Sequence, residues 1–347
     1  MRKNTLTELK KIIKPGLNKC TRIPALCRNL TSTFFQHIKA PTTKIKYKKK
    51  LKELITLITK RWRFASLLII AFFTIYYGLG AAVSSKINNP LEINIKLPQK
   101  TTKYLTPTMA YVLKTQVDDS AWVPALPAIF PATILDNLPN FQLGVKDSIL
   151  YLTKRLAALY KNDKLKEAGE LLDYPSDIWL FSQTEENKFA PGSAKQYRKA
   201  LAKIAEFTPS QNNIITQQQE LSYILTSISH LIKRQITKLE KQIQEHNSEI
   251  LDFKADDRFY YAQGTSFTIY HILSATAKDY QTVIVEKNQY ENITSALKYL
   301  KDAVQLSPLT IQNGALADSY TANHLLYIAY YLAQAQNQIN QISCAIK

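Results

Sequence analysis

The residues best suited to chemistry in this sequence are a few histidines and the groups around them. Beyond residue 84 there are four histidines, and only His271 and His324 lie among the apolar residues of expected helices. A histidine on an apolar helix face is more often a hydrogen-bonded core residue than a ligand. A pocket that joined both histidines to Tyr261 and Asp136 would nevertheless supply groups for general acid–base chemistry.

Acidic pairs and tyrosines offer less specific signals. Glu185-Glu186 and Asp256-Asp257 occur in loops or where helices are expected to begin, and we interpret them as solvated caps. A group of four tyrosines either lines a groove or fills a wide seam between helices: Tyr260, Tyr261, Tyr270 and Tyr280.

Standard catalytic and cofactor-binding motifs are absent from the sequence. It has no Walker loop, Gly-x-Gly-x-x-Gly, His-Glu-x-x-His or Gly-x-Ser-x-Gly pattern, and only 8 glycines to build a phosphate-binding loop. Cys20 and Cys27 lack the second half of a metal site, and Cys344 is the one cysteine beyond residue 84, so it has no disulfide partner there. We therefore expect no cofactor, no metal and no assigned reaction, and a non-enzymatic role is favoured.

The elements that would position these residues begin with an apolar stretch. Residues 64–83 are 20 residues without a charge, which as a helix reach about 30 Å, the hydrocarbon thickness of a bilayer. Arg61, Trp62 and Arg63 precede it and suit a membrane interface. Gly80-Ala81-Ala82 resembles a cleavage site, but the long arm and the long apolar stretch favour an uncleaved transmembrane helix over a signal peptide.

The distribution of charge predicts the topology. Residues 1–63 hold 18 Lys and Arg against two acids, a net of +16 out of +18, so the rest of the chain is nearly neutral. Basic segments stay in the cytoplasm, which predicts a cytoplasmic arm over 1–63 and, in a bacterium, an inner-membrane anchor with a periplasmic domain. The neutral domain makes nucleic acid an unlikely partner.

The arm itself allows two interpretations. A basic helix with apolar positions at Leu51, Leu54, Ile55 and Ile58 would attract anionic lipid near the membrane. The simpler interpretation, which we favour, is that the charge only fixes the topology. No aromatic stacking pattern accompanies the charge, which argues against binding of nucleic acid by the arm.

The rest of the chain predicts an all-α fold. We expect a linker over 84–101 and a multi-helix bundle over 102–347, in which one long helix of about 40 residues covers 210–251. Its single apolar stripe implies an intramolecular bundle or a coiled coil with a partner. Helix starts are predicted at Thr106-Pro107 and at the capping boxes Ser193–Gln196 and Thr208–Gln211.

The segment 122–131 is too rich in proline for a regular helix or a central strand. It either packs over the core as an ordered apolar loop or lies at the membrane, with Trp122 and Phe130 at the interface. The sequence leaves both alternatives open.

From the apolar stretch to the C-terminus, the sequence resembles a proteobacterial inner-membrane family, the domain-of-unknown-function family numbered 2333. Three local matches carry the resemblance: residues 135–144, residues 257–264 followed by His271, and Asn313-Gly314 with Asn323-His324 downstream. The resemblance implies the same topology and a helical outer domain, but no reaction. It selects these residues for testing as a functional surface or pocket: Asp136, Asn137, Asn140, Tyr261, Gly264, His271, Asn313 and His324.

Three functions remain in competition. The leading hypothesis is a membrane-anchored periplasmic interaction or scaffold component of the bacterial envelope, which binds a protein partner or another copy of itself. The second is a ligand-binding or hydrolytic domain with a pocket around His271 and His324. The third is a subunit of a multi-protein envelope or secretion complex.

Overall fold

The computed structural model describes residues 41–84, 86–95, 103–183, 189–208, 215–246, 254–308, 310–314 and 322–347. The chain divides into two compact units, Met1–Phe72 and Phe73–Lys347. Glu185-Glu186, the Cys20 and Cys27 pair, most of the basic arm and most of the Thr208–Gln211 box lie outside the described residues.

The first described element is the long helix α3, Pro41–Ser84. Its residues Thr59–Val83 are long and apolar enough to cross a membrane, and very little of this stretch is buried against protein. The stretch predicted from the sequence, 64–83, lies inside this segment. Leu51, Leu54, Ile55 and Ile58 belong to the same helix, as their spacing predicted.

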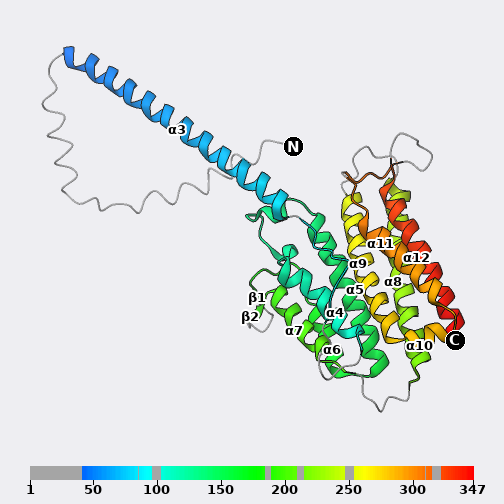
Figure 1. Ribbon diagram of the computed structural model, residues 1–347. Coiled ribbons are helices and arrows are strands. Elements are labelled where there is room, and N and C mark those ends of the chain that lie inside the picture. The colour runs from blue at the N-terminus through cyan, green and yellow to red at the C-terminus, as the bar shows by residue number, and fades with distance from the viewer. Residues whose placement is uncertain are drawn as a thin grey trace, which may run out of the picture. The chain divides into compact units, whose positions relative to one another are not determined.

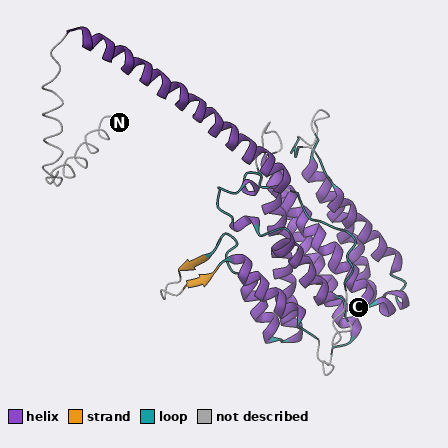
Figure 2. Ribbon diagram, turned by 60° about the vertical axis from the view of Figure 1, so that its left-hand side comes forward, coloured by secondary structure: helices purple, strands orange, loops and turns teal. Residues whose placement is uncertain are grey.

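The second unit is built almost entirely of helices, which confirms the all-α prediction (Figures 1 and 2). In chain order the remaining described elements are α4 Leu105–Lys114, the π-helical turn η1 Thr115–Asp119, the 3₁₀ turns η2 Val123–Ala125 and η3 Pro131–Thr133, α5 Asn137–Tyr160, α6 Asp163–Leu172, β1 Phe181–Gln183, β2 Phe189–Pro191, α7 Ser193–Ala205, α8 Gln217–His246, α9 Ala255–Asp279, α10 Gln281–Glu286, α11 Tyr290–Gln305 and α12 His324–Ile346.

Two groups of helices share one core. Helices α8, α9, α11 and α12 pack against one another, and α4, α5, α6 and α7 form a second group. The most extensive contact in the unit joins α5 to α9, which lie side by side in Figure 1. Most of the buried apolar side chains from both groups form one continuous cluster. The α5–α9 contact therefore holds the two halves of the bundle together.

The apolar stripe predicted for the long helix lies on α8 and packs within the same chain. Leu225, Ile232 and Leu239 are fully buried, and the helix packs chiefly against α12 of the same chain. The described helix has 30 residues rather than about 40. Its capping pair is Thr216 and Gln219, in which each side-chain oxygen accepts a hydrogen bond from the other residue's backbone N–H at 3.1–3.2 Å.

Helices begin close to two of the predicted starts, but the predicted capping residues do not cap them because tertiary partners replace the local caps. Helix α4 begins at Leu105, and the carboxylate of Asp279 accepts hydrogen bonds from the backbone N–H groups of Tyr104 and Leu105. Ser193 is inside α7 and does not cap it. Its hydroxyl instead donates to the Pro175 carbonyl and accepts from the backbone N–H of Ile178.

Two elements were not predicted. Helix α5 ends at Lys161, whose φ of 49° is left-handed, and the Asn162 side chain then caps α6 by accepting from the Leu165 N–H. Within the connector 174–193, strands β1 and β2 form an antiparallel hairpin in which Phe181 faces Pro191. Helix α6 belongs to the second helix group, and the hairpin lies beside α7 on the side of that group away from α9 (Figure 1).

One of the two aromatic residues singled out in the proline-rich segment belongs to the core. Trp122 is buried, its indole N–H donates to the Ser176 carbonyl at 2.7 Å, and its ring meets Tyr197 edge-on. Trp122 is thus a core residue and does not lie at a membrane interface. The Phe130 ring packs instead against Trp179, on the surface of the unit.

Part of the predicted linker is ordered against the bundle. Residues 86–95, which we call the strap, are extended, and Ile87 and Leu91 pack against the core. The strap carbonyls of Asn88 and Pro90 accept hydrogen bonds from Gln116 and His271. The strap therefore fixes the chain that follows α3 to the bundle; residues 96–102 lie outside the described residues.

Candidate functional site: the α5–α9 seam

Two glycines let α5 and α9 touch backbone to backbone. A Cβ at Gly264 would overlap the carbonyl oxygen of Phe141, and a Cβ at Gly144 would overlap that of Tyr261. Only glycine permits such an approach from both sides. We call the residues along this contact the α5–α9 seam: Asp136, Asn140, Gly144 and Asp147 with Asp257, Tyr261 and Gly264.

Acidic residues gather where the two helices of the seam begin. The amide of Asn140 donates to a carboxylate oxygen of Asp257 at 2.5 Å. Burial, and then the neighbouring carboxylates of Asp136 and Asp256, raise the pKa of Asp257 to about 6. The Asp256-Asp257 pair thus meets a third carboxylate, that of Asp136 just before α5.

The same three carboxylates are the described residues that could hold a cation. One oxygen from each of Asp136, Asp256 and Asp257 lies within 4.8 Å of the others. Oxygen ligands at this spacing suit hard divalent cations. Asp136 is exposed and Asn140 already occupies one oxygen of Asp257, so the cluster is explained equally well as a surface group of acids.

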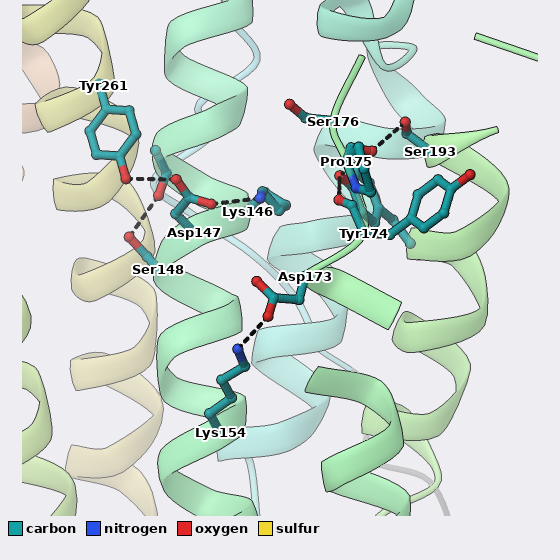
Figure 3. A network of polar contacts seen from close by, with 12 residues as sticks. Lys146, Asp147, Ser148, Lys154, Asp173, Tyr174, Pro175, Ser176, Ser193 and Tyr261 are labelled. Carbon is teal, nitrogen blue, oxygen red and sulfur yellow. Dashed lines mark hydrogen bonds and ion pairs between the residues drawn. The ribbon is translucent and has the colours of Figure 1, made fainter. Parts of the chain in front are cut away.

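Further along the seam, Tyr261 links three helices. Its hydroxyl donates to Asp147 at 2.8 Å, and the other Asp147 oxygen pairs with the ammonium of Lys146 at 2.6 Å (Figure 3). The ammonium of Lys238 on α8 lies 4.7 Å from the centre of the Tyr261 ring. Burial, and then the Asp147 charge, raise the pKa of Tyr261, so the phenol stays a neutral donor.

His271 lies on α9 but is occupied by the strap. Its side chain is buried, its Nε2 donates to the Pro90 carbonyl at 2.9 Å, and its ring packs edge-on against Phe267. Burial lowers the pKa of His271 to about 4, so the ring is neutral at physiological pH. The interpretation as a hydrogen-bonded core histidine fits these contacts.

Shallow grooves flank the strap. One, of about 730 Å³, is lined by strap residues with Tyr270, His271 and Lys278. The other, of about 670 Å³, is lined by strap residues with Asn137, Tyr260 and Gln263. The tyrosines thus serve both predicted purposes: Tyr261 and Tyr280 fill packed interior positions, while Tyr260 and Tyr270 line grooves.

Asn313 and His324 belong to a separate polar turn before α12. Asn313 and Asn323 form an isolated antiparallel bridge, and the Asn323 amide donates to the Asn313 side chain at 3.0 Å. The backbone N–H of Gln312 donates to His324 Nδ1, and the Asn323 side chain caps α12. These contacts fix the start of α12, and burial lowers the pKa of His324.

The structure therefore brings together only some of the predicted site residues. Asp136, Asn140, Tyr261 and Gly264 share the seam, and Asn137 lines the groove beside it. His271 binds the strap. Asn313 and His324 lie in the polar turn before α12, where Asn313 accepts a hydrogen bond from Asn323 and His324 accepts one from Gln312. The two histidines have separate surroundings.

One polar cluster was missed by the sequence argument. The half-buried ammonium of Lys103 reaches both the buried carboxylate of Glu220 at 2.5 Å and the hydroxyl of Tyr280 at 3.0 Å. Tyr160 also donates to Glu220. Glu220 stands in the first turn of α8, which is the only local signal the sequence gave. Every polar group named here has a partner within the chain, so we interpret the cluster as a structural one.

The comparisons with known proteins separate the helical bundle from α3 and the basic arm. The family model described as an uncharacterized protein conserved in bacteria, DUF2333, matches residues 100–345. The chain belongs to the DUF2333 family. The match covers the helical bundle and leaves out α3 and the basic arm. Neither the curated proteins nor the solved structures gave a match to the chain.

Within this DUF2333 chain, the three local sequence matches now have structural meanings. Residues 135–144 and 257–264 meet in the seam, and the third match builds the turn before α12. Their hydrogen-bonding groups are largely used to join helices. The arrangement therefore organises the bundle, and the surfaces left for binding are the grooves beside the strap and the exposed faces of the helices.

Proposed function

We propose that this DUF2333 protein is a bacterial envelope component that α3 anchors in the inner membrane, with the basic arm in the cytoplasm and the helical bundle in the periplasm. The bundle acts as an interaction or scaffold domain for a protein partner or a second copy. The observation that carries the anchor is the stretch Thr59–Val83, which is 25 residues long and almost free of protein cover.

Physical chemistry links that observation to a bilayer. Leu67, Ile70 and Phe72 are each more than half exposed, and so is much of the helix around them. Burial of apolar surface is worth about 25 cal/mol per Å², so a helix of this kind in water would aggregate. The net charge of +16 before residue 64 supports an inside arm and an outside bundle.

The occupied polar groups of the seam support a binding role over a catalytic one. The hydroxyl of Tyr261, the Nε2 of His271 and the amide of Asn140 are each engaged by a group of the same chain. A catalytic base or nucleophile needs a free atom that faces substrate. No reaction is therefore proposed for the seam.

A surface on α12 is the first place to look for a protein partner. Leu326, Tyr327 and Tyr330 are 44–53% exposed on this helix. Exposed aromatic residues are enriched at protein interfaces. In this proposal they supply contacts to a partner or to a second copy of the chain, including the case of a larger envelope complex.

The topology is tested by a reporter fused after Lys347. An alkaline phosphatase fusion, which is active only in an oxidising compartment, should be active, and a green fluorescent fusion at the same position should be dark after export. The same fusions placed after Lys50 should give the opposite result. An active cytosolic reporter after Lys347 would refute the proposed topology and with it the periplasmic role.

The partner is tested by photocrosslinking in intact cells. A photoreactive amino acid in place of Tyr330 should crosslink to a defined protein or to a second copy, and mass spectrometry would identify it. The matched position is Tyr290 on α11, which is 64% exposed. Equal crosslinking from both positions would contradict a specific interface on α12.

A second function, binding of a small ligand beside the strap, is favoured by the two grooves that His271 and Asn137 help to line. Because the His271 ring is tied to Pro90, this proposal concerns binding and not hydrolysis. It predicts a ligand whose stabilisation of the bundle is lost in a Lys278→Ala variant, because Lys278 is the cationic residue that lines the larger groove. Retained stabilisation in that variant would argue against this groove.

A further inference from the structure

Exposed large apolar side chains of the bundle unit outside α3 are concentrated in one region. Among the described residues after residue 84, seven of the twelve such side chains come from two segments, the loop before α5 and the segment that enters and forms the hairpin. We call these seven the apolar rim: Ile129, Ile134 and Leu135 of the loop, with Trp179, Leu180, Phe181 and Phe189 of the hairpin segment. Their exposed fractions run from 40% at Leu135 to 70% at Phe189.

The two segments of the rim touch and are held rigidly. The rings of Phe130 and Trp179 meet edge-on with their centres 5.7 Å apart. The hairpin is closed by its strand pairing and by the Gly192 N–H, which donates to the Leu180 carbonyl at 2.7 Å. The exposed side chains of the two segments therefore belong to one preformed surface.

The loop of the rim is fixed against the end of α3. The Tyr76 hydroxyl donates to the Ile129 carbonyl at 3.2 Å, and Pro131 lies directly against Gly80, where a Cβ would have no room. Tyr76 and Gly80 both belong to the stretch Thr59–Val83. Tyr76 precedes Val83 by about 10 Å along the helix axis.

This contact sets the depth of the rim relative to a bilayer. The uncharged residues 64–83 measure about 30 Å as a helix, which matches the hydrocarbon thickness, while Arg61, Trp62 and Arg63 lie at the opposite interface. Val83 then lies at the boundary between acyl chains and headgroups on the side of the bundle. A loop that contacts the helix at Tyr76 and Gly80 therefore lies within about 10 Å of that boundary.

We propose that the apolar rim inserts into the boundary layer of the same membrane that α3 crosses, so that the bundle rests on the lipid surface as well as being tethered to it. This inference depends on the proposed membrane anchor. Lipid is the occupant favoured by continuity with α3 and by the residue types, since Trp and Phe prefer the interface.

The experiment measures the depth of single labelled positions in the full-length chain. Cys20, Cys27 and Cys344 are replaced by Ser, and one cysteine is introduced by Phe189→Cys, Leu180→Cys, Leu79→Cys or Tyr290→Cys. Each variant carries an environment-sensitive fluorophore and is reconstituted in phosphatidylcholine–phosphatidylglycerol vesicles. Lipids with a spin label near the headgroup or deep in the acyl chain then quench the fluorescence.

The expected result is quenching at 79, 180 and 189 and none at 290. At 180 and 189 the shallow spin label should quench several-fold more than the deep one. Quenching at 79 with none at 180 and 189 would overturn the rim proposal and leave the anchor intact. Absence of quenching at 79 would refute the anchor itself. Equal quenching at 189 and 290 would show that lipid contacts the bundle without any preference for the rim, which also overturns the proposal.

Discussion

The α5–α9 seam places polar side chains inside the bundle, whereas the apolar rim places apolar side chains on its surface. The seam uses glycines, an amide, carboxylates and a phenol inside the bundle, where each polar group meets a partner. The rim leaves Phe, Trp, Ile and Leu side chains on the outside, where they are 40–70% exposed. The polar residues of the seam serve to join two helices. The apolar residues of the rim suit a neighbour other than water, which in our proposal is lipid.

The largest expected effect comes from filling the closest point of the seam. Gly264→Ala places a Cβ against the Phe141 backbone, which cannot move away without separating α5 from α9. The free energy of unfolding should fall by about 3 kcal/mol in thermal or denaturant unfolding of the detergent-solubilised protein. The control is Gly78→Ala, where no atom lies within 4 Å of the new Cβ. Equal effects at both positions would contradict the close approach.

A smaller loss is expected from the phenol of the seam. Tyr261→Phe removes the hydrogen bond to Asp147, whose carboxylate keeps its ion pair with Lys146. We expect a loss of about 1.5 kcal/mol in the free energy of unfolding. Tyr290→Phe, at an exposed tyrosine on α11, should change it by almost nothing. No difference between the two variants would show that the hydrogen bond does not contribute.

At the acidic end of the seam, removal of a charge should raise the free energy of unfolding, whereas the two preceding substitutions lower it. The pKa of Asp257 is about 6 in the folded protein against an ordinary value of 3.8, so the folded state binds more protons between these values. Stability contributed by this group is therefore lost as pH rises from about 4 to about 6. Asp257→Asn should stabilise the protein at pH 7 by up to about 1 kcal/mol, after allowance for partial exposure, and have little effect at pH 4.

The readout is the difference in unfolding free energy between Asp257→Asn and the unmodified protein, measured at both pH values. A marked loss of stability at pH 7 would contradict repulsion within the cluster and would indicate that the three carboxylates are held by a bound cation.

The smallest effect on stability is expected in the rim. Phe189→Ser removes a side chain that is 70% exposed and should change the free energy of unfolding by less than about 0.5 kcal/mol. The matched substitution Phe259→Ser, at a fully buried phenylalanine of α9, should cost several times more. A large loss at Phe189 would mean that the rim is part of the folded core, and the contrast with the seam would fail.

The seam and the rim also mark what sequence could and could not predict. The apolar stripe of α8 and the uncharged stretch of α3 were predictable because each pattern is local and repeats with the helical period. The motif glycine Gly264 was selected by family resemblance, but its close approach to Phe141 depends on a helix more than a hundred residues away. The same separation hid the meeting of Asp136 with Asp257.

Helix caps and short elements could not be predicted from the sequence for a related reason. Ser193 has the right residue type to cap α7, but Pro175 and Ile178 supply stronger tertiary partners for its hydroxyl. The hairpin of β1 and β2 has strands of three residues, too short for alternation to show. Trp122 could be placed in the core or at the membrane until its bond to Ser176 was visible.

The strap ties the chain that follows α3 to the bundle through few contacts. Two described side chains, Gln116 and His271, hold its carbonyls. If these two bonds, the apolar contacts of Ile87 and Leu91, and the contacts of Tyr76 and Gly80 with the loop before α5 all gave way, the chain between Ser84 and Leu105 would be long enough to span about 70 Å. The distance that the bundle can keep from the end of α3 therefore depends on a small set of bonds, of which one is donated by the buried side chain of His271.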